Sequence, residues 1–147
     1  MTAVLEIALV GAHMTGLPLN GEITALGGRF LRAVRTEPCY RLYALPGGPP
    51  HRPGLLRVAA NDGVAIALEV WSLPSHQVGA LLAAIPAPLG LGTLRLDDGT
   101  APKGFLVEAE GVRGATDISR FGGWRAFLDQ AALDRAALDR AAGREPA

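Results

Sequence analysis

Short apolar segments separated by turns rich in glycine, proline and aspartate run through most of this chain, and they predict a mainly β fold. The segments expected as strands are residues 4–10, 29–34, 40–45, 55–59, 64–71, 93–96 and 104–109. Asn61-Asp62-Gly63 and Asp97-Asp98-Gly99-Thr100 have the sequence of hairpin turns. Hairpins pair neighbouring strands antiparallel, so we expect an α+β domain: a small, mostly antiparallel β-barrel or strongly curled sheet with flanking helices.

Three segments have helical rather than strand periodicity. Residues 21–26 are expected to form one helical turn, and Ser75 is a suitable N-cap for a helix that Pro86 ends. The apolar residues of that helix recur at steps of three and four: Val78, Leu81, Leu82 and Ile85. Asp117 or Ser119 would cap a C-terminal helix. Its apolar face is expected to pack on the sheet through Phe121, Trp124, Phe127 and Leu128.

The expected domain covers residues 1–129, and residues 130–147 form a tail. Ala-Ala-Leu-Asp-Arg occurs there twice, at 131–135 and 136–140. A period of five puts Leu133 and Leu138 on different faces of a helix, so the tail is expected to be helical or disordered and exposed to solvent.

Composition excludes several classes of partner. The 147 residues suit one domain, and 14 basic and 14 acidic residues are spread without a long run of like charge, which argues against nucleic-acid binding. The uncharged stretch at 70–94 is broken by prolines and glycines, which argues against a membrane helix. Cys39 is the single cysteine and the chain begins without a basic leader, so we expect a cytoplasmic protein.

The loop at residues 11–20 is the best candidate for a ligand site. It follows the first apolar strand directly, and Gly11 and Gly16 allow the chain to fold back and turn its N–H groups toward an anion. His13 lies at the end of that strand, and an imidazole is the side chain best suited to exchange a proton near neutral pH. A plain β-turn with a solvent-facing imidazole is the alternative.

Other polar residues have two readings. On the strand at 40–45, Tyr40 and Arg41 point to opposite sides, so only one of them can line a pocket with His13. Glu69 is either an outward-facing carboxylate or a buried one with a partner or a chemical role. The three histidines lack the spacing of a metal site, and nucleotide and dinucleotide loops are absent, so neither metal nor cofactor is expected.

Six segments of the sequence, taken together, resemble one family. They are Gly11–Asn20, Tyr40–Pro49, Glu69–Trp71, Ile85–Gly90, Lys103–Phe105 and Gly122–Arg125. In this order they resemble the C-terminal domain of allophanate hydrolases over about residues 4–128. That domain is similar in fold to γ-glutamylcyclotransferases, whose strand-to-loop motif binds a substrate carboxylate through backbone donors. Gly11, Ala12 and His13 take the corresponding places.

The resemblance implies decarboxylation of N-carboxycarbamate during urea or allophanate breakdown. His13 would give a proton to the nitrogen, and the carboxylates would be held by the loop N–H groups, Asn20 and a cation such as Lys103 or Arg41. The expected substrate-binding residues are Gly11, Ala12, Met14, Asn20, Tyr40, Arg41, Glu69 and Lys103. The amidase domain of these enzymes has no counterpart here, which implies a separate amidase as partner and leaves room for a homodimer. A non-catalytic assembly module is the alternative.

A γ-glutamylcyclotransferase is a third, weaker interpretation. The catalytic glutamate of that family would fall within Ile85–Gly90, and this segment contains no acidic residue.

Overall fold

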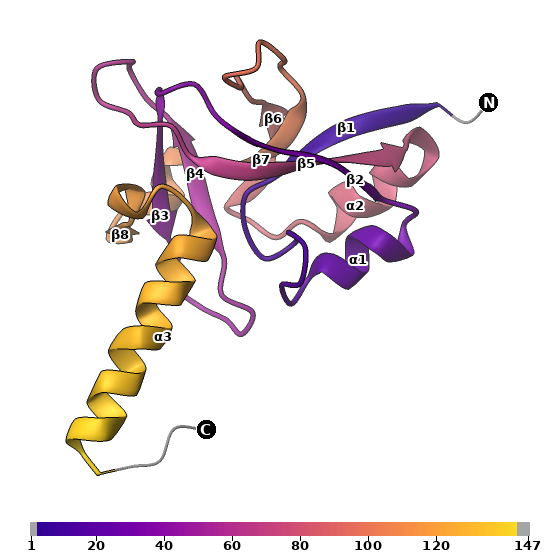
Figure 1. Cartoon of the computed structure of the whole chain (residues 1–147). Coiled ribbons are helices and arrows are strands. Elements are labelled where there is room, and N and C mark those ends of the chain that lie inside the picture. The colour runs from indigo at the N-terminus through magenta and orange to yellow at the C-terminus, as the bar shows by residue number, and fades with distance from the viewer. Residues whose placement is uncertain (1–2, 144–147) are drawn as a thin grey trace.

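The computed structural model describes residues 3–143, and its largest element is a five-stranded sheet (Figure 1). The sheet has the order β2-β5-β1-β7-β6. Its strands are β1 (Val4–Leu9), β2 (Arg29–Arg35), β5 (Ala67–Pro74), β6 (Leu89–Thr93) and β7 (Lys103–Val107). The pairs β1/β5, β2/β5 and β6/β7 are antiparallel, whereas β1 and β7 run parallel. The sheet is therefore mostly antiparallel, as the sequence predicted.

A second sheet has three strands in the order β4-β3-β8, namely β3 (Tyr40–Ala44), β4 (Pro53–Arg57) and β8 (Thr116–Asp117). β4 crosses close to β7, because a Cβ added to Gly54 would lie 2.9 Å from the side chain of Val107. No ladder joins the two sheets within residues 3–143, and each keeps two edge strands. The expected closed barrel is therefore wrong.

The Asn61–Gly63 turn does not form the expected hairpin. β4 pairs with β3, and β5 pairs with β1 and β2, so the chain changes sheets at this turn. Gly63 lies against the backbone of Cys39 and Tyr40, where an added Cβ would come within 2.6 Å of the Tyr40 nitrogen. An Asp-Gly sequence predicts a local reversal of the chain, whereas tertiary packing determines which strands pair.

The later hairpin forms, but one strand is displaced in sequence. β6 covers Leu89–Thr93, a stretch that was expected to be mostly loop, and it pairs with β7. Thr100 closes the intervening turn by accepting a hydrogen bond from Leu96 (3.0 Å), and Gly99 has the left-handed φ of +87° that this turn needs.

Helices cover the sheet ends. They are α1 (Asn20–Ala25), a short 3₁₀ turn at Ser75–Gln77 followed by α2 (Val78–Ala84), 3₁₀ turns at Ala109–Val112 and Ser119–Phe121, and α3 (Trp124–Ala141). Ser75 and Ser119 cap neither α2 nor α3, since the N-cap of α3 is Gly123 without a side-chain hydrogen bond. Asp117 instead accepts the N–H of Ser119 at 2.8 Å and so orders the turn before α3.

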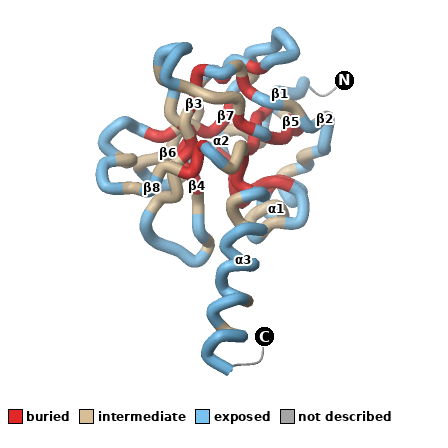
Figure 2. The backbone as a smooth tube through the Cα atoms, turned by 60° about the vertical axis from the view of Figure 1, so that its left-hand side comes forward, coloured by how far each residue is buried: buried red, intermediate tan, exposed pale blue. Residues whose placement is uncertain are grey.

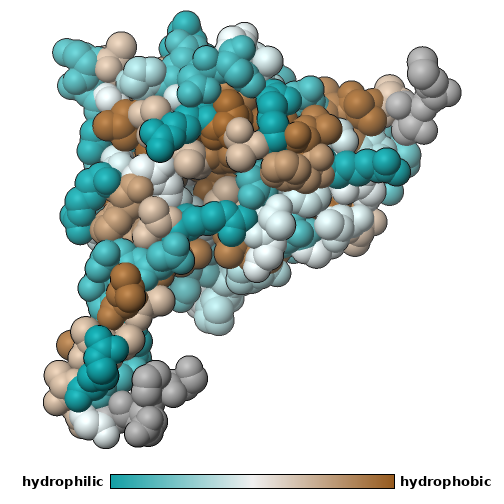
Figure 3. Space-filling view, viewed as in Figure 1, coloured by the Kyte–Doolittle hydropathy of each residue, from teal (hydrophilic) through white to brown (hydrophobic). Residues whose placement is uncertain are grey.

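The buried residues gather in the body of the molecule, while α3 projects from it (Figure 2). The first turn of α3 is anchored because Trp124 is buried and stacks on Phe127 with ring centroids 5.3 Å apart. Beyond that turn the helix continues without a break through the expected tail, and Leu133 and Leu138 are each 64% exposed. Figure 3 shows a mixture of hydrophilic and hydrophobic side chains on this projecting part.

The search for membrane-spanning segments gives a negative result for the described part of the chain, where no helix is both long and apolar enough.

Candidate functional site

The loop at residues 11–20 folds back on itself and is held by its own polar groups. The carbonyl of Ala12 accepts the N–H of Leu19 at 2.9 Å, and the Asn20 side chain donates to the carbonyl of His13 at 2.8 Å. Asn20, expected to bind substrate, thus orders the loop from its far end. These bonds fix the backbone around His13.

The two glycines of the loop have different roles. Gly11 permits close contact with β4, since an added Cβ would lie 2.5 Å from Cδ of Pro53. Gly16 has φ of +76°, in the left-handed region that favours glycine, and an added Cβ would meet nothing within 4 Å. The loop therefore needs one glycine for space and the other for backbone conformation.

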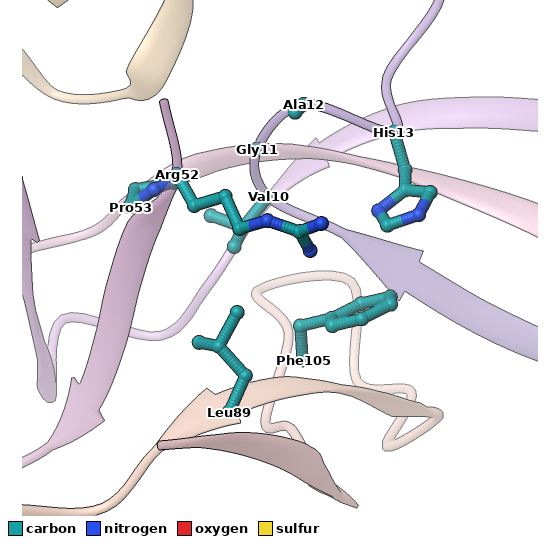
Figure 4. Close-up of a pocket in the computed structure, with 8 residues that line it drawn as sticks. All are labelled: Val10, Gly11, Ala12, His13, Arg52, Pro53, Leu89 and Phe105. Atoms are coloured by element: carbon teal, nitrogen blue, oxygen red, sulfur yellow. The ribbon is translucent and has the colours of Figure 1, made fainter. Parts of the chain in front are cut away.

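The ring of His13 is buried and held on two sides. Only 7% of the residue is exposed, and the ring stacks on Phe105 with centroids 5.0 Å apart and planes inclined by 19°. Nε2 lies 3.2 Å from Oε1 of Glu22 on α1. Because a carboxylate only accepts hydrogen bonds, Nε2 carries the hydrogen and the other nitrogen, Nδ1, is left free. Figure 4 shows that nitrogen turned toward Arg52.

The surroundings of His13 shift its proton equilibrium. Burial lowers the pKa of the ring below its ordinary 6.5; the contact with Glu22 opposes this shift, and the positive charge of Arg52 adds to it. Both burial and Arg52 therefore favour the neutral form of the ring. A bound anion near Arg52 would favour the protonated form.

A small cavity opens beside the ring (Figure 4). Its volume is about 20 Å³, and its walls are Val10, Gly11, Ala12, His13, Arg52, Pro53, Leu89 and Phe105. Within residues 3–143, no backbone hydrogen bond uses the N–H groups of Gly11, Ala12 or His13. These three consecutive donors therefore have no partner in the described part of the chain.

Arg52 is a residue of the cavity wall that the sequence did not reveal. Its guanidinium reaches into the cavity toward His13 in Figure 4. The side chain is partly buried, yet it has no ion-pair partner among residues 3–143. Arg52 sits in a stretch of prolines and glycines that looked like a plain surface loop. No signal in the sequence could have singled it out, because Arg52 reaches the cavity through the contact of Pro53 with Gly11, which only the tertiary structure shows.

Glu69 lies on the neighbouring strand but does not reach the cavity of His13. Its Oε1 accepts the N–H and hydroxyl of Thr15, both at 2.9 Å, and the indole N–H of Trp71 at 3.0 Å, while Oε2 accepts from Arg125 at 2.9 Å. Burial would raise the pKa of this carboxyl, but these donated bonds outweigh burial and lower it. Glu69 is thus a buried, paired carboxylate that anchors the loop through Thr15.

Met14 faces the same side as Glu69. The two residues line a separate cavity of about 290 Å³ beneath the start of α3. Met14 is buried in the core, so its side chain is turned away from the His13 ring's cavity.

Three further candidates lie elsewhere. Tyr40 is fully buried, and its hydroxyl accepts the N–H of Arg95 at 3.0 Å. Arg41 is ion-paired with Asp117, and Lys103 is exposed and donates to Thr93 at 2.7 Å. None of the three lines the cavity of His13. Arg52 takes the position that Arg41 or Lys103 was expected to fill.

No group of three His, Cys, Asp or Glu side chains that could hold a metal occurs in the part of the chain described by the structure. Cys39 is a buried free thiol. The site therefore consists of an imidazole, a guanidinium and backbone donors.

Comparison with known proteins shows what the chain is similar to. The family described as Allophanate hydrolase C-terminal domain matches residues 5–129. A urea amidolyase of Saccharomyces cerevisiae is 39% identical over 128 residues, which make up 85% of this chain and 7% of the yeast protein. The chain thus spans a small part of the curated relatives that it matches.

Solved structures show a likeness to the same kind of protein. An allophanate hydrolase of Kluyveromyces lactis superposes with a TM-score of 0.84 at 37% identity, over 88% of this chain and 22% of that one. A protein described as specific to uropathogenic E. coli superposes with a TM-score of 0.80 at 34% identity, over 86% of this chain and 97% of that one.

A γ-glutamyl cyclotransferase shares the fold alone, with a TM-score of 0.54 at 9% identity over 78% of this chain and 70% of that one. The expected likeness to that fold is confirmed without the closed barrel. With the match over residues 5–129, this chain belongs to the allophanate hydrolase C-terminal domain family.

Proposed function

We propose that this protein accelerates the decarboxylation of N-carboxycarbamate to carbamate and carbon dioxide, in the cytoplasmic breakdown of urea or allophanate. The observation that carries the proposal is the meeting of His13, the unpaired Arg52 and three free N–H groups around one cavity. A proton-exchanging ring beside donors for a carboxylate is what loss of CO₂ from a carbamate requires.

The reaction needs one proton for each turnover. The C–N bond to the departing carboxylate breaks, its electron pair returns to nitrogen, nitrogen takes up the proton, and CO₂ leaves. The Nδ1 side of His13 would deliver that proton, while Nε2 stays bound to Glu22. Arg52 and the N–H groups of Gly11 and Ala12 would hold the carboxylates. Because the dianion brings negative charge next to the ring, its binding would raise the pKa of His13 and charge the donor.

In the test, an amidase generates N-carboxycarbamate in the presence of the purified protein, and the rate of CO₂ release is compared with the rate in buffer alone. We expect acceleration by the wild type and its loss in His13→Ala. His76→Ala is the matched control, since His76 is exposed and lies outside the cavity. A wild-type rate equal to that in buffer would refute the proposal.

A second candidate is assembly with a separate amidase or with a second copy of this chain. The observation in its favour is the projecting α3 with its exposed Leu133 and Leu138. Size-exclusion chromatography of the protein, alone and with the amidase, measures this. A strictly monomeric protein that does not co-elute would rule assembly out.

Cyclotransferase activity has no support from the cavity, because none of the residues that line it is acidic.

A further inference from the structure

A second cavity adjoins the one at His13, and the two share Arg52 and Leu89 as wall residues. The second cavity has a volume of about 280 Å³. It lies between the loop after β3 and the segment joining α2 to β6, and four prolines form much of its wall: Pro46, Pro50, Pro86 and Pro88. The guanidinium of Arg52 thus stands at a boundary between two spaces.

The cavity at His13 is too small for the proposed substrate. Its 20 Å³ is room for about one water molecule. N-carboxycarbamate has two carboxylates on one nitrogen and needs several times that space. One carboxylate can place an oxygen beside the ring and the free N–H groups, but the rest of the molecule must extend past Arg52.

The charge distribution points the same way. Arg52 is the one charged residue among those that line the larger cavity, and the other wall residues are apolar or glycine. A guanidinium presents donors in a plane and can bind carboxylate oxygens on more than one edge. A side chain that is partly buried, unpaired within residues 3–143 and open to both cavities is placed to bind two carboxylates of one molecule.

The geometry points to one elongated binding site that spans both cavities and takes a short linear dicarboxylate end to end, with Arg52 between its two halves. The inference rests on the proposed function, because it names the substrate class of that same site. The reacting half lies at His13, and the half that stays behind lies in the proline-walled cavity. The same site therefore admits dianions longer than N-carboxycarbamate, up to the length of the larger cavity.

Stable dicarboxylates test the site without any reaction. Isothermal titration calorimetry would compare acetate, malonate and glutarate binding to the full-length protein. We expect malonate and glutarate to bind at least tenfold more tightly than acetate, because acetate has a single carboxylate and gains nothing from the second half of the site. Arg52→Gln should remove this advantage. Arg57→Gln is the matched control, since Arg57 is exposed at the end of β4, the strand that follows Arg52, and lines neither cavity.

Substitutions that fill the larger cavity measure how much this cavity contributes to dicarboxylate binding. Ala87 is exposed at its rim, so Ala87→Phe should weaken glutarate binding at least tenfold and leave acetate unchanged, with Ala87→Leu as a milder variant. Ala84→Phe, an exposed position on α2 outside the cavities, should bind as the wild type does. Equal binding of acetate and malonate, or glutarate binding unaffected by both Ala87 variants, would overturn the inference. Dicarboxylate binding as expected without CO₂ release would instead refute decarboxylation and keep the two-part site.

Discussion

Glu22 and His13 are joined across the mouth of the loop, with Oε1 of the carboxylate 3.2 Å from Nε2 of the ring. Glu22 lies on α1 and His13 on the loop before it, so the contact ties the ring to a regular element. It settles which nitrogen carries the hydrogen in the neutral ring and leaves Nδ1 for the cavity. Glu22 therefore acts on the proposed reaction through the ring, as a positioning residue.

This contact predicts a shift in pH dependence. Glu22 raises the pKa of His13 against the lowering effect of burial, so Glu22→Gln should lower that pKa further. If protonated His13 is the donor, kcat/KM, corrected for the reaction in buffer, should decline as the pH rises above the His13 pKa. In Glu22→Gln this decline should begin at a lower pH. Rates of CO₂ release, corrected for buffer at each pH, would measure both profiles.

Glu22→Leu removes the hydrogen-bond acceptor as well as the charge, so it should reduce kcat about 10- to 100-fold even at low pH, in line with a general acid that has lost its orientation. Titration of the His13 ring by NMR supplies a readout that does not depend on turnover. An unchanged ring pKa in Glu22→Gln would contradict the positioning role.

A second prediction concerns stability at the loop's anchor. Glu69 accepts four hydrogen bonds from Thr15, Trp71 and Arg125 in a nearly buried position. Glu69→Gln leaves at least one donor facing another donor, so we expect it to destabilise the fold by about 2–3 kcal/mol at pH 7. Urea denaturation measures this loss. Glu110→Gln, in an exposed ion pair with Arg113, should change stability by less than about 0.5 kcal/mol.

The Glu69 contribution should also depend on pH. The folded protein holds the pKa of Glu69 below its ordinary 4.5, so the unfolded chain binds the proton first as pH falls. The stabilisation is complete above pH 4.5 and is lost as the pH drops through the folded-state pKa. The gap between wild type and Glu69→Gln should therefore shrink in acid, and a gap of constant size would show that ionisation of Glu69 does not matter.

The sequence was informative about the loop because its signals are local. A branched apolar strand followed by Gly11 and Gly16 predicts a turn whatever the rest of the chain does, and His13 stands at a fixed distance from that strand. Arg52 and Glu22 carry no such signal. Arg52 reaches the cavity only because Pro53 packs on Gly11, and that contact belongs to the tertiary structure.

The same limit explains the errors in topology. Alternation of polar and apolar residues placed most strands within a few positions, since it depends on neighbouring residues alone. The partner of each strand depends on contacts between distant segments, such as β5 with β1, and the Asp62-Gly63 turn could not reveal them. The closed barrel was inferred from strand count and hairpins, and it was wrong once β4 and β5 belonged to different sheets.

A third prediction tests the close contact beneath the cavity. Gly11→Ala places a Cβ 2.5 Å from the ring of Pro53, which has little freedom to move, so β4 and the loop must separate. We expect the free energy of unfolding to fall by about 1–3 kcal/mol, and each kcal/mol should lower Tm by about 2–4 °C. Malonate binding should weaken as well. Gly21→Ala should have neither effect, because its added Cβ would meet nothing within 4 Å. Wild-type binding by Gly11→Ala would show that the loop tolerates the shift.

The fourth prediction concerns the boundary of the domain. α3 is held to the body through Trp124, Phe127 and Leu128, whereas Leu133 and Leu138 remain 64% exposed. Little apolar area is therefore buried beyond residue 130, and the burial of such area is what stabilises a packed helix. A chain ending at Gln130 should have a free energy of unfolding within about 1 kcal/mol of that of the full chain, and it should bind malonate equally well. If the truncation turns a dimer into a monomer and leaves stability and binding unchanged, the outer half of α3 serves assembly. A large loss of stability in the monomer would instead place it within the folding unit.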